Sequence, residues 1–255
     1  MELNDLKEKS SKGEKIVALT CYDFTFASLI DKCGVDITLV GDSLGMVIKG
    51  YDTTLSVTIE EMIYHTRCVA SGIKNSIVMA DLPFSTYQES PEKAYSNASK
   101  LLEAGAKIIK LEGNAWIKKT INFLSSRDIP VCSHIGMLPQ SLHKIGGYKV
   151  QGDSPEEASR LLKLSLELER EGADVLVLEL VTKSLAKEIT TSVKIPTIGI
   201  GSGPSTNGQV LVLYDILGLD SKVKPRFVKN FMRGNDSIKK CIEAYALSVR
   251  SGIYP

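Results

Sequence analysis

The segment Gly172-Ala173-Asp174-Val175-Leu176-Val177-Leu178-Glu179 shows the pattern that decides the fold. Its glycine is placed to end a helix, its apolar run has the length of a strand buried on both faces, and its last residue is an acid. A similar segment follows Gly105 and ends at Glu112, and shorter versions end at Asp42 and Asp81. Because parallel sheets bind ligands at the carboxyl ends of their strands, four acids at one edge indicate an active site.

Eight strand-like segments alternate with helical ones along the chain. They cover residues 16–20, 37–40, 77–80, 107–111, 131–134, 174–178, 197–200 and 209–213. Helix starts are marked by Thr58–Glu61, Ser90-Pro91 and Ser154–Glu157, the first and last of which read as capping boxes. A basic loop over residues 222–229 and a final helix over 236–251 complete the chain.

Eight βα units in 255 residues predict a (β/α)8 TIM barrel. A doubly wound sheet is the alternative, but it rarely has eight units at this length. The sequence contains no linker, low-complexity tract or shift in composition, so we expect a single domain over residues 1–255.

Composition excludes several classes of function. The residues are 43% hydrophobic and 24% charged, and the formal net charge of +1 argues against a nucleic-acid partner. The 5 cysteines are odd in number and lack a Cys-x-x-Cys spacing, which predicts free thiols in a reducing cytosol rather than disulfides or zinc. The charged amino terminus predicts no signal peptide, and no apolar run approaches the ~18 residues of a membrane span.

Lys110 and Glu112 are the most informative pair. They lie two apart in a strand-like segment, so their side chains point to the same face, opposite the apolar Ile109 and Leu111. We therefore expect both to point into the barrel near its carboxyl end. A lysine there suits the binding of a substrate carboxylate better than packing.

Asp42 and Asp81 are the best candidates for metal ligands, because carboxylate oxygens suit Mg²⁺. The alternative for each is a helix N-cap just after a strand. Ser43 follows Asp42 and offers a hydroxyl or a backbone N–H to a bound carboxylate.

His134 ends the fifth segment, where it suits metal or substrate binding, whereas His65 lies inside a helical pattern and reads as structural. Glu179 closes an apolar run, and we expect burial to raise its pKa and make it a better base. The turn Gly199–Gly203 reads as a close-packed turn rather than a phosphate loop, because no basic residue lies near it. The glycine-rich stretch 145–152 suits a cover over the site.

Eight motifs together resemble the ketopantoate hydroxymethyltransferase (3-methyl-2-oxobutanoate hydroxymethyltransferase) family. They occur in the family's order and cover nearly the whole chain: Thr20-Cys21-Tyr22-Asp23, Val40-Gly41-Asp42-Ser43-Leu44-Gly45-Met46, Tyr64-His65-Thr66, Ala80-Asp81-Leu82-Pro83-Phe84, Lys110-Leu111-Glu112-Gly113, Gly146-Gly147-Tyr148-Lys149-Val150-Gln151-Gly152, Leu176-Val177-Leu178-Glu179 and Ile198-Gly199-Ile200-Gly201. The chain departs from the family pattern at Met137, Leu138, Ser202 and Asn207.

The resemblance implies a (β/α)8 barrel of the pyruvate/phosphoenolpyruvate type. It implies transfer of a hydroxymethyl group from 5,10-methylenetetrahydrofolate to 3-methyl-2-oxobutanoate through a Mg²⁺-stabilised enolate, which gives ketopantoate for pantothenate and coenzyme A. The implied site residues are Asp42, Asp81 and Glu112 for Mg²⁺; Ser43, Lys110 and His134, with both aspartates, for the keto acid; and Glu179 as the proton acceptor.

The family is typically a cytoplasmic homo-oligomer, often a decamer, and the resemblance implies the same for this chain, with a 2-oxo acid and folate as its small-molecule partners. The balanced charge and the lack of a long apolar run argue against a nucleic-acid or membrane partner. The alternative activity is a Mg²⁺-dependent 2-oxo acid lyase of the isocitrate lyase or phosphoenolpyruvate mutase type. Such sites need an Asp-x-Asp run and a Lys-Cys-Gly-His loop, and the sequence has neither. A barrel kept as a binding scaffold would not need the four acids.

Overall fold

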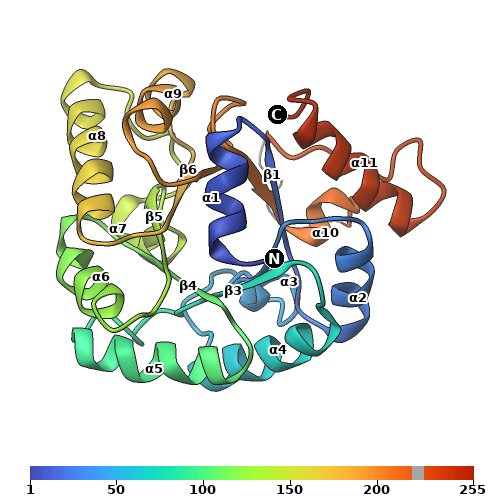
Figure 1. Cartoon of the computed structure of the whole chain (residues 1–255), viewed down its shortest axis with the longest axis horizontal. Helices are drawn as coiled ribbons and strands as arrows, with labels where there is room; N and C mark the ends of the chain where they lie inside the picture. Colours follow the sequence, from blue (N-terminus) through green and yellow to red (C-terminus); the bar gives the residue numbers. More distant parts are fainter. Residues whose placement is uncertain (220–226) are drawn as a thin grey trace.

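Eight parallel strands form a closed barrel in a computed structural model, which describes residues 1–219 and 227–255 (Figure 1). Each strand pairs with its neighbour in the sequence, and β8 pairs with β1 to close the barrel. The strands are β1 Ile16–Thr20, β2 Ile37–Val40, β3 Ile77–Asp81, β4 Ile108–Glu112, β5 Val131–Gly136, β6 Val175–Glu179, β7 Thr197–Ile200 and β8 Gly208–Leu211. The predicted TIM barrel is confirmed.

The carboxyl ends of the strands differ from the predictions in three ways. The fifth strand was predicted to end at His134 but continues to Gly136. The acids expected just after three strands are their last residues, Asp81, Glu112 and Glu179. The last strand was predicted to reach Leu213 but ends at Leu211, because Leu213 begins the short helix α10, Leu213–Ile216. An apolar run alone does not distinguish these two conformations.

Helices surround the barrel. They are α1 Leu3–Ser11, α2 Phe24–Lys32, α3 Leu44–Val47, α4 Ile59–Gly72, α5 Pro91–Glu103, η1 Ala115–Ile117, α6 Lys118–Ser125, η2 Pro139–Ser141, α7 Leu142–Ile145, α8 Pro155–Arg170, α9 Lys183–Ser192 and α11 Ile238–Arg250, in addition to α10. Thr58 and Glu61 form the predicted capping box of α4. Ser154 caps α8, but the predicted second half of its box is wrong: Glu157 lies 3.7 Å from Arg160 instead.

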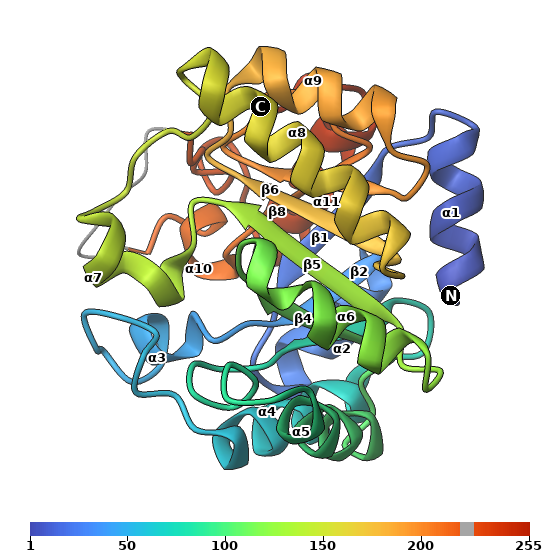
Figure 2. The same ribbon diagram turned by 90° about the vertical axis from the view of Figure 1, so that its left-hand side faces the viewer.

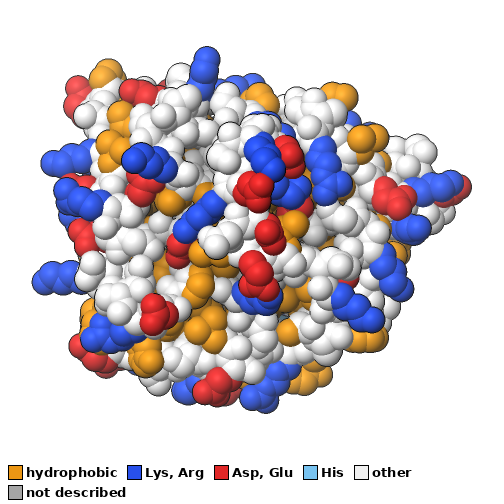
Figure 3. All heavy atoms as spheres, viewed as in Figure 1, with side chains coloured by type: hydrophobic (Ala, Val, Ile, Leu, Met, Phe, Trp, Pro, Cys, Tyr) orange, Lys and Arg blue, Asp and Glu red, His pale blue; other side chains and the backbone are white. Residues whose placement is uncertain are grey.

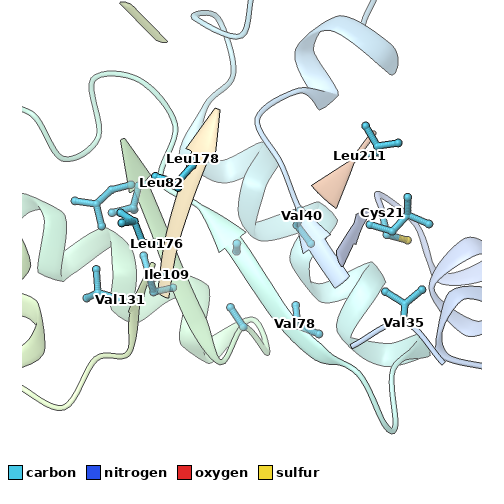
Figure 4. Close-up of a cluster of buried hydrophobic side chains, with 14 of the residues drawn as sticks. Cys21, Val35, Val40, Val78, Leu82, Ile109, Val131, Leu176, Leu178 and Leu211 are labelled. Atoms are coloured by element: carbon cyan, nitrogen blue, oxygen red, sulfur yellow. The ribbon is translucent and has the colours of Figure 1, made fainter. Parts of the chain in front are cut away.

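The strands separate two apolar layers. Residues at alternate positions, such as Ile108, Val175 and Val177, fill the inside of the barrel. The intervening positions, such as Ile109 and Leu176, pack in the layer between the sheet and the helices (Figure 4). This alternation confirms the predicted orientation of β4 and places its polar residues on the inner face.

The helix α1 closes the amino end of the barrel, a role that the sequence did not predict. Leu6 is fully buried and joins the apolar cluster inside the barrel. Lys7 lies 2.8 Å from Asp174, and the amino group of Met1 donates to the carbonyl of Asn75. Figure 2 shows α1 at one end of the barrel and α3 and α7 at the other. Ligand access is therefore left to the carboxyl end.

The surface in Figure 3 carries acidic and basic side chains side by side, in keeping with the balanced charge of the sequence. Cys21, Cys33, Cys132 and Cys241 are buried free thiols, and Cys68 is half-buried. Within the described ranges no helix is long and apolar enough to cross a membrane. Residues 222–226 of the predicted basic loop lie outside those ranges.

Candidate active site

Neighbouring strands bring ionisable side chains together at the carboxyl end of the barrel. Asp81 of β3 is in register with Lys110 of β4, and Glu112 of β4 is in register with His134 of β5. Glu179 ends β6, the next strand. All but Glu179 are buried, at 1–7% exposure, so interactions among them decide their charge.

The first group of the site centres on Lys110. Its ammonium donates to Asp81 Oδ1 over 2.7 Å, and Asp81 Oδ2 accepts the backbone N–H of Asp42 over 3.1 Å. Burial lowers the pKa of Lys110, but the carboxylates of Asp81, Asp42 and Glu112 outweigh burial and raise it. Lys110 is therefore a charged ammonium that links β3 and β4.

The second group centres on His134. Its Nδ1 lies 3.4 Å from Glu112 Oε2 and its Nε2 lies 3.3 Å from Glu179 Oε2. Neither contact has hydrogen-bond geometry, so we treat both as ion pairs. Burial and the Lys110 ammonium lower the pKa of His134, but Glu112 and Glu179 outweigh them and raise it to about 9.

A protonated imidazole is the state in which both ring nitrogens can face carboxylates. The apolar run that ends at Glu179 predicted an acid buried among apolar residues. The structure corrects this, because the Glu179 carboxylate lies beside His134 and its side chain is 12% exposed. Sequence periodicity could not show the pairing, because it depends on the register of β5 and β6.

Gln140 is a site residue that the sequence did not single out. Its side-chain amide donates to Asp42 Oδ2 over 2.9 Å, and its backbone N–H donates to Glu112 Oε1 over 2.7 Å. Tyr87 donates its hydroxyl to Gln140 Oε1 over 2.7 Å or to the carbonyl of Glu112 over 2.8 Å. Gln140 lies in η2, where no strand or helix period marks an inward-facing residue.

Ser43 lies at the rim beside these groups. Its hydroxyl is 2.9 Å from the hydroxyl of Tyr22 and is half-buried. Tyr148, in the glycine-rich stretch after α7, is 42% exposed. Burial raises the pKa of Tyr148, and so do the nearby charges of Glu179 and Asp42. That the glycine-rich stretch covers the site stays a prediction.

The N-cap alternative for the two aspartates is wrong. Ser43, not Asp42, occupies the N-cap position of α3 and makes no side-chain capping bond. Asp81 is the last residue of β3, and its two oxygens face Lys110 and the N–H of Asp42. Asp42 and Asp81 therefore belong to the buried polar cluster.

The donor set fits a divalent cation completed by water or ligand oxygens. Burial, together with the neighbouring charges of Asp81 and Glu112, raises the pKa of Asp42 to about 7. A bound cation would reverse that effect. No three His, Cys, Asp or Glu side chains among residues 1–219 and 227–255 form a group that could hold a metal unaided. Mg²⁺ accepts such a site, because it is often held by one or two carboxylates and keeps several waters.

Glu112 does not complete a three-residue group with the aspartates, because its two carboxylate oxygens face the N–H of Gln140 and the ring of His134. Charge balance also favours a cation. The site has four carboxylates against the two cationic side chains, Lys110 and His134, which leaves an excess of two negative charges when all are ionised. One divalent ion would balance it.

Two other predicted features are structural. Positive φ angles at Gly201 and Gly203 and close neighbours at both make 199–203 a packed turn, as predicted. Ser202 in this turn accepts the N–H of Val181 and donates to the carbonyl of Leu178. His65 is half-buried and its Nδ1 lies 2.6 Å from the carbonyl of Tyr22, which confirms its structural role.

Comparison with known proteins gives one consistent result. Residues 1–255 match the ketopantoate hydroxymethyltransferase family. The 3-methyl-2-oxobutanoate hydroxymethyltransferase of Nitrosomonas eutropha is 53% identical over 94% of this chain and 90% of its own. That of Nitrosomonas europaea is 49% identical over 100% and 95%, respectively.

Solved structures show the fold at much lower identity. Phosphonopyruvate hydrolase aligns with a TM-score of 0.65 at 14% identity, over 99% of this chain and 98% of its own. A 2,3-dimethylmalate lyase of the PEP mutase/isocitrate lyase superfamily aligns with a TM-score of 0.58 at 15% identity, over 82% and 80%. These structures share the barrel, and at this identity they carry no argument about activity.

Proposed function

The chain belongs to the ketopantoate hydroxymethyltransferase family, and from that premise we propose its reaction, cofactor and site residues. The reaction transfers a hydroxymethyl group from 5,10-methylenetetrahydrofolate to 3-methyl-2-oxobutanoate and gives 2-dehydropantoate (ketopantoate) for pantothenate and coenzyme A synthesis. Relatives about half identical over nearly the whole chain carry the name of this activity. The lyase alternative is supported only by the shared fold.

The observation that carries the proposal is the set of two charge groups at one end of the barrel. Lys110 with Asp81 and Asp42 forms one group, and His134 with Glu179 lies in the other. A keto acid needs a cation for its carboxylate, an electrophile for its keto oxygen and a base for its C3 proton. Lys110 offers the cation, Glu179 offers the base, and the two aspartates would hold a divalent ion as the electrophile.

Asp42 and Asp81 are the residues that would hold Mg²⁺, and the Glu112 carboxylate would lie beside the ion. When bound there, Mg²⁺ supplies a Lewis acid for the keto oxygen and carboxylate of the substrate. Lys110 offsets the charge of the substrate carboxylate, and the Ser43 hydroxyl donates to it. His134 lies between Glu112 and Glu179 and orients both through its two ring nitrogens.

Glu179 is the proposed proton acceptor. The C3–H bond of the keto acid breaks, the proton goes to the Glu179 carboxylate, and the electron pair forms the enolate. C3 then bonds to the methylene carbon of the folate, whose two C–N bonds break during the transfer. Water provides the hydroxyl oxygen, the proton taken from C3 and one proton of the water go to the two folate nitrogens, and tetrahydrofolate leaves. The partial exposure of Glu179 fits a base that must reach a substrate entering from the carboxyl end.

The test is product formation. Purified protein is mixed with 3-methyl-2-oxobutanoate, 5,10-methylenetetrahydrofolate and Mg²⁺, and ketopantoate is measured by proton NMR. We expect product that depends on protein and folate and that stops when a chelator removes the metal. Folded protein that makes no ketopantoate under these conditions would overturn the proposal.

Asp81→Asn tests the cation site separately. We expect it to raise the Mg²⁺ concentration needed for half-maximal rate, because one ligand loses its charge. Asp153→Asn, an exposed acid before α8, is the matched control. Equal Mg²⁺ dependence in both variants would refute Asp81 as a ligand while leaving the reaction itself standing.

We also propose that the enzyme works in the cytoplasm as a homo-oligomer, often a decamer in its family, with small molecules as its only other partners. Exposed apolar side chains such as Tyr64, Leu247 and Ile253 are available to an interface between copies. Light scattering of the purified protein measures the mass, and a monomer at micromolar concentration would refute the proposal.

A further inference from the structure

We propose that Gln140 is a positioning residue that holds Asp42 in the orientation that binds the divalent cation. This inference rests on the cation site of the proposed function. It assigns a role to a side chain that touches no reacting atom but contacts a proposed ligand directly.

The orientation of the Gln140 amide follows from its four neighbours. On one side lie two acceptors, Asp42 Oδ2 at 2.9 Å and the carbonyl of Leu82 at 3.0 Å. On the other side lie two donors, the Tyr87 hydroxyl at 2.7 Å and the Gln88 amide at 3.1 Å. Only one orientation satisfies all four, with NH₂ toward Asp42 and oxygen toward Tyr87. A flipped amide would place oxygen against oxygen.

The same residue reaches a second carboxylate through its main chain. The Gln140 N–H donates to Glu112 Oε1 over 2.7 Å, while Tyr87 contacts the backbone of Glu112. Gln140 is buried, at 8% exposure, so these bonds are shielded from water. One residue of η2 thus ties together the ends of β2, β3 and β4.

The consequence concerns the orientation of the Asp42 carboxylate. Oδ2 accepts from Gln140, which restrains the side-chain rotamer and would keep the carboxylate ready to bind a cation. Outer partners that orient a metal ligand in this way usually change metal affinity 10–100-fold when they are removed. Gln140 should therefore act on cation affinity more than on the chemical step.

The test is direct binding of Mn²⁺, used as a paramagnetic probe for Mg²⁺, with no substrate present. The free Mn²⁺ signal in electron paramagnetic resonance gives the Kd for wild type and for Gln140→Met. Methionine keeps the size of the side chain and the backbone N–H but removes the bond to Asp42. We expect the Kd to rise about tenfold or more.

Gln209→Met is the matched control. Gln209 is also a buried glutamine, and its amide bonds to the carbonyl of Gly203 and the hydroxyl of Thr206, outside the carboxylate cluster. We expect this variant to lose some thermal stability and to keep the wild-type Kd. Tyr87→Phe is the milder second variant if Gln140→Met does not fold, because it removes one donor to Gln140 Oε1, and it should weaken Mn²⁺ binding by less.

Exchange of the C3 proton of 3-methyl-2-oxobutanoate in D₂O provides a second readout. If Gln140 positions a ligand, high Mg²⁺ should restore most of the exchange rate of folded Gln140→Met. An unchanged Kd in folded Gln140→Met, or an equal loss in Gln209→Met, would overturn the inference and leave the proposed reaction intact. Absence of saturable Mn²⁺ binding in wild type would overturn the cation site and, with it, this inference.

Discussion

Replacing Lys110 with methionine should destabilise the protein strongly. The Lys110 ammonium is 2.7 Å from Asp81, and the two side chains are only 9% and 5% exposed. Asp42 and Glu112 lie close enough to raise its pKa as well. The Lys110→Met variant keeps the length and the apolar stem of the side chain but leaves these carboxylates without their cation.

The size of the effect follows from the burial of the pair. Removing one partner of a buried ion pair costs roughly 3–5 kcal/mol. For a chain of this length, each kcal/mol lowers the melting temperature by about 2–4 °C, so we expect a fall of roughly 6–20 °C. Because the pKa of Lys110 is raised, its contribution is complete at pH 7 and is lost only above the ordinary lysine pKa of about 10.4.

The assay is thermal unfolding at pH 7, followed by circular dichroism with and without Mg²⁺. Lys118→Met is the control, because Lys118 pairs with Glu167 over 3.0 Å with the two side chains 32% and 20% exposed. Pairs exposed to water contribute little, so its melting temperature should fall much less. Mg²⁺ should restore part of the loss in Lys110→Met by offsetting the same charges. An equal fall in melting temperature in Lys110→Met and Lys118→Met would refute the reasoning.

Three further outcomes are expected. Asp31→Asn should destabilise the protein at pH 7, because backbone N–H groups lower the pKa of Asp31 despite its burial. The difference in unfolding free energy between wild type and variant, measured in urea, should shrink as the pH falls below the ordinary aspartate pKa of 3.8, and a constant difference would contradict this. Leu6→Ala should cost roughly 2–5 kcal/mol in urea unfolding yet keep the turnover of folded protein, because Leu6 seals the end of the barrel opposite the site; lost turnover in folded protein would argue otherwise. Gly136→Ala should abolish ketopantoate formation, because Gly136 has φ 97° and a Cβ there would lie 2.2 Å from the carbonyl oxygen of Glu179. Ketopantoate formation at the wild-type rate would show that β5 and β6 accommodate the added methyl group without displacing Glu179.

Regular alternation made most of the barrel and half of the site predictable. Lys110 and Glu112 could be placed inside the barrel because a strand repeats every two residues and the apolar Ile109 and Leu111 mark the other face. The caps at Thr58 and Ser90 could be recognised because their bonds lie within one turn of chain. Both kinds of inference use local contacts only.

The features that the sequence did not reveal depend on contacts between distant segments. Gln140 meets Asp42 across 98 residues and Glu112 across 28, and no local period marks it. The pairing of His134 with Glu179 follows from strand register rather than from either segment alone. The sequence did not predict that α1 closes the amino end of the barrel, because its one fully buried residue, Leu6, lies among charged neighbours.

The most direct test of the proposed mechanism is the rate at which the protein exchanges the C3 proton of 3-methyl-2-oxobutanoate for deuterium, measured by proton NMR with Mg²⁺ and without folate. Wild type should exchange it, and Glu179→Gln should exchange it about 10²–10⁴-fold more slowly while still binding Mn²⁺. Glu156→Gln, an exposed acid in the first turn of α8, should behave as wild type. Exchange at the wild-type rate in Glu179→Gln would contradict Glu179 as the proton acceptor.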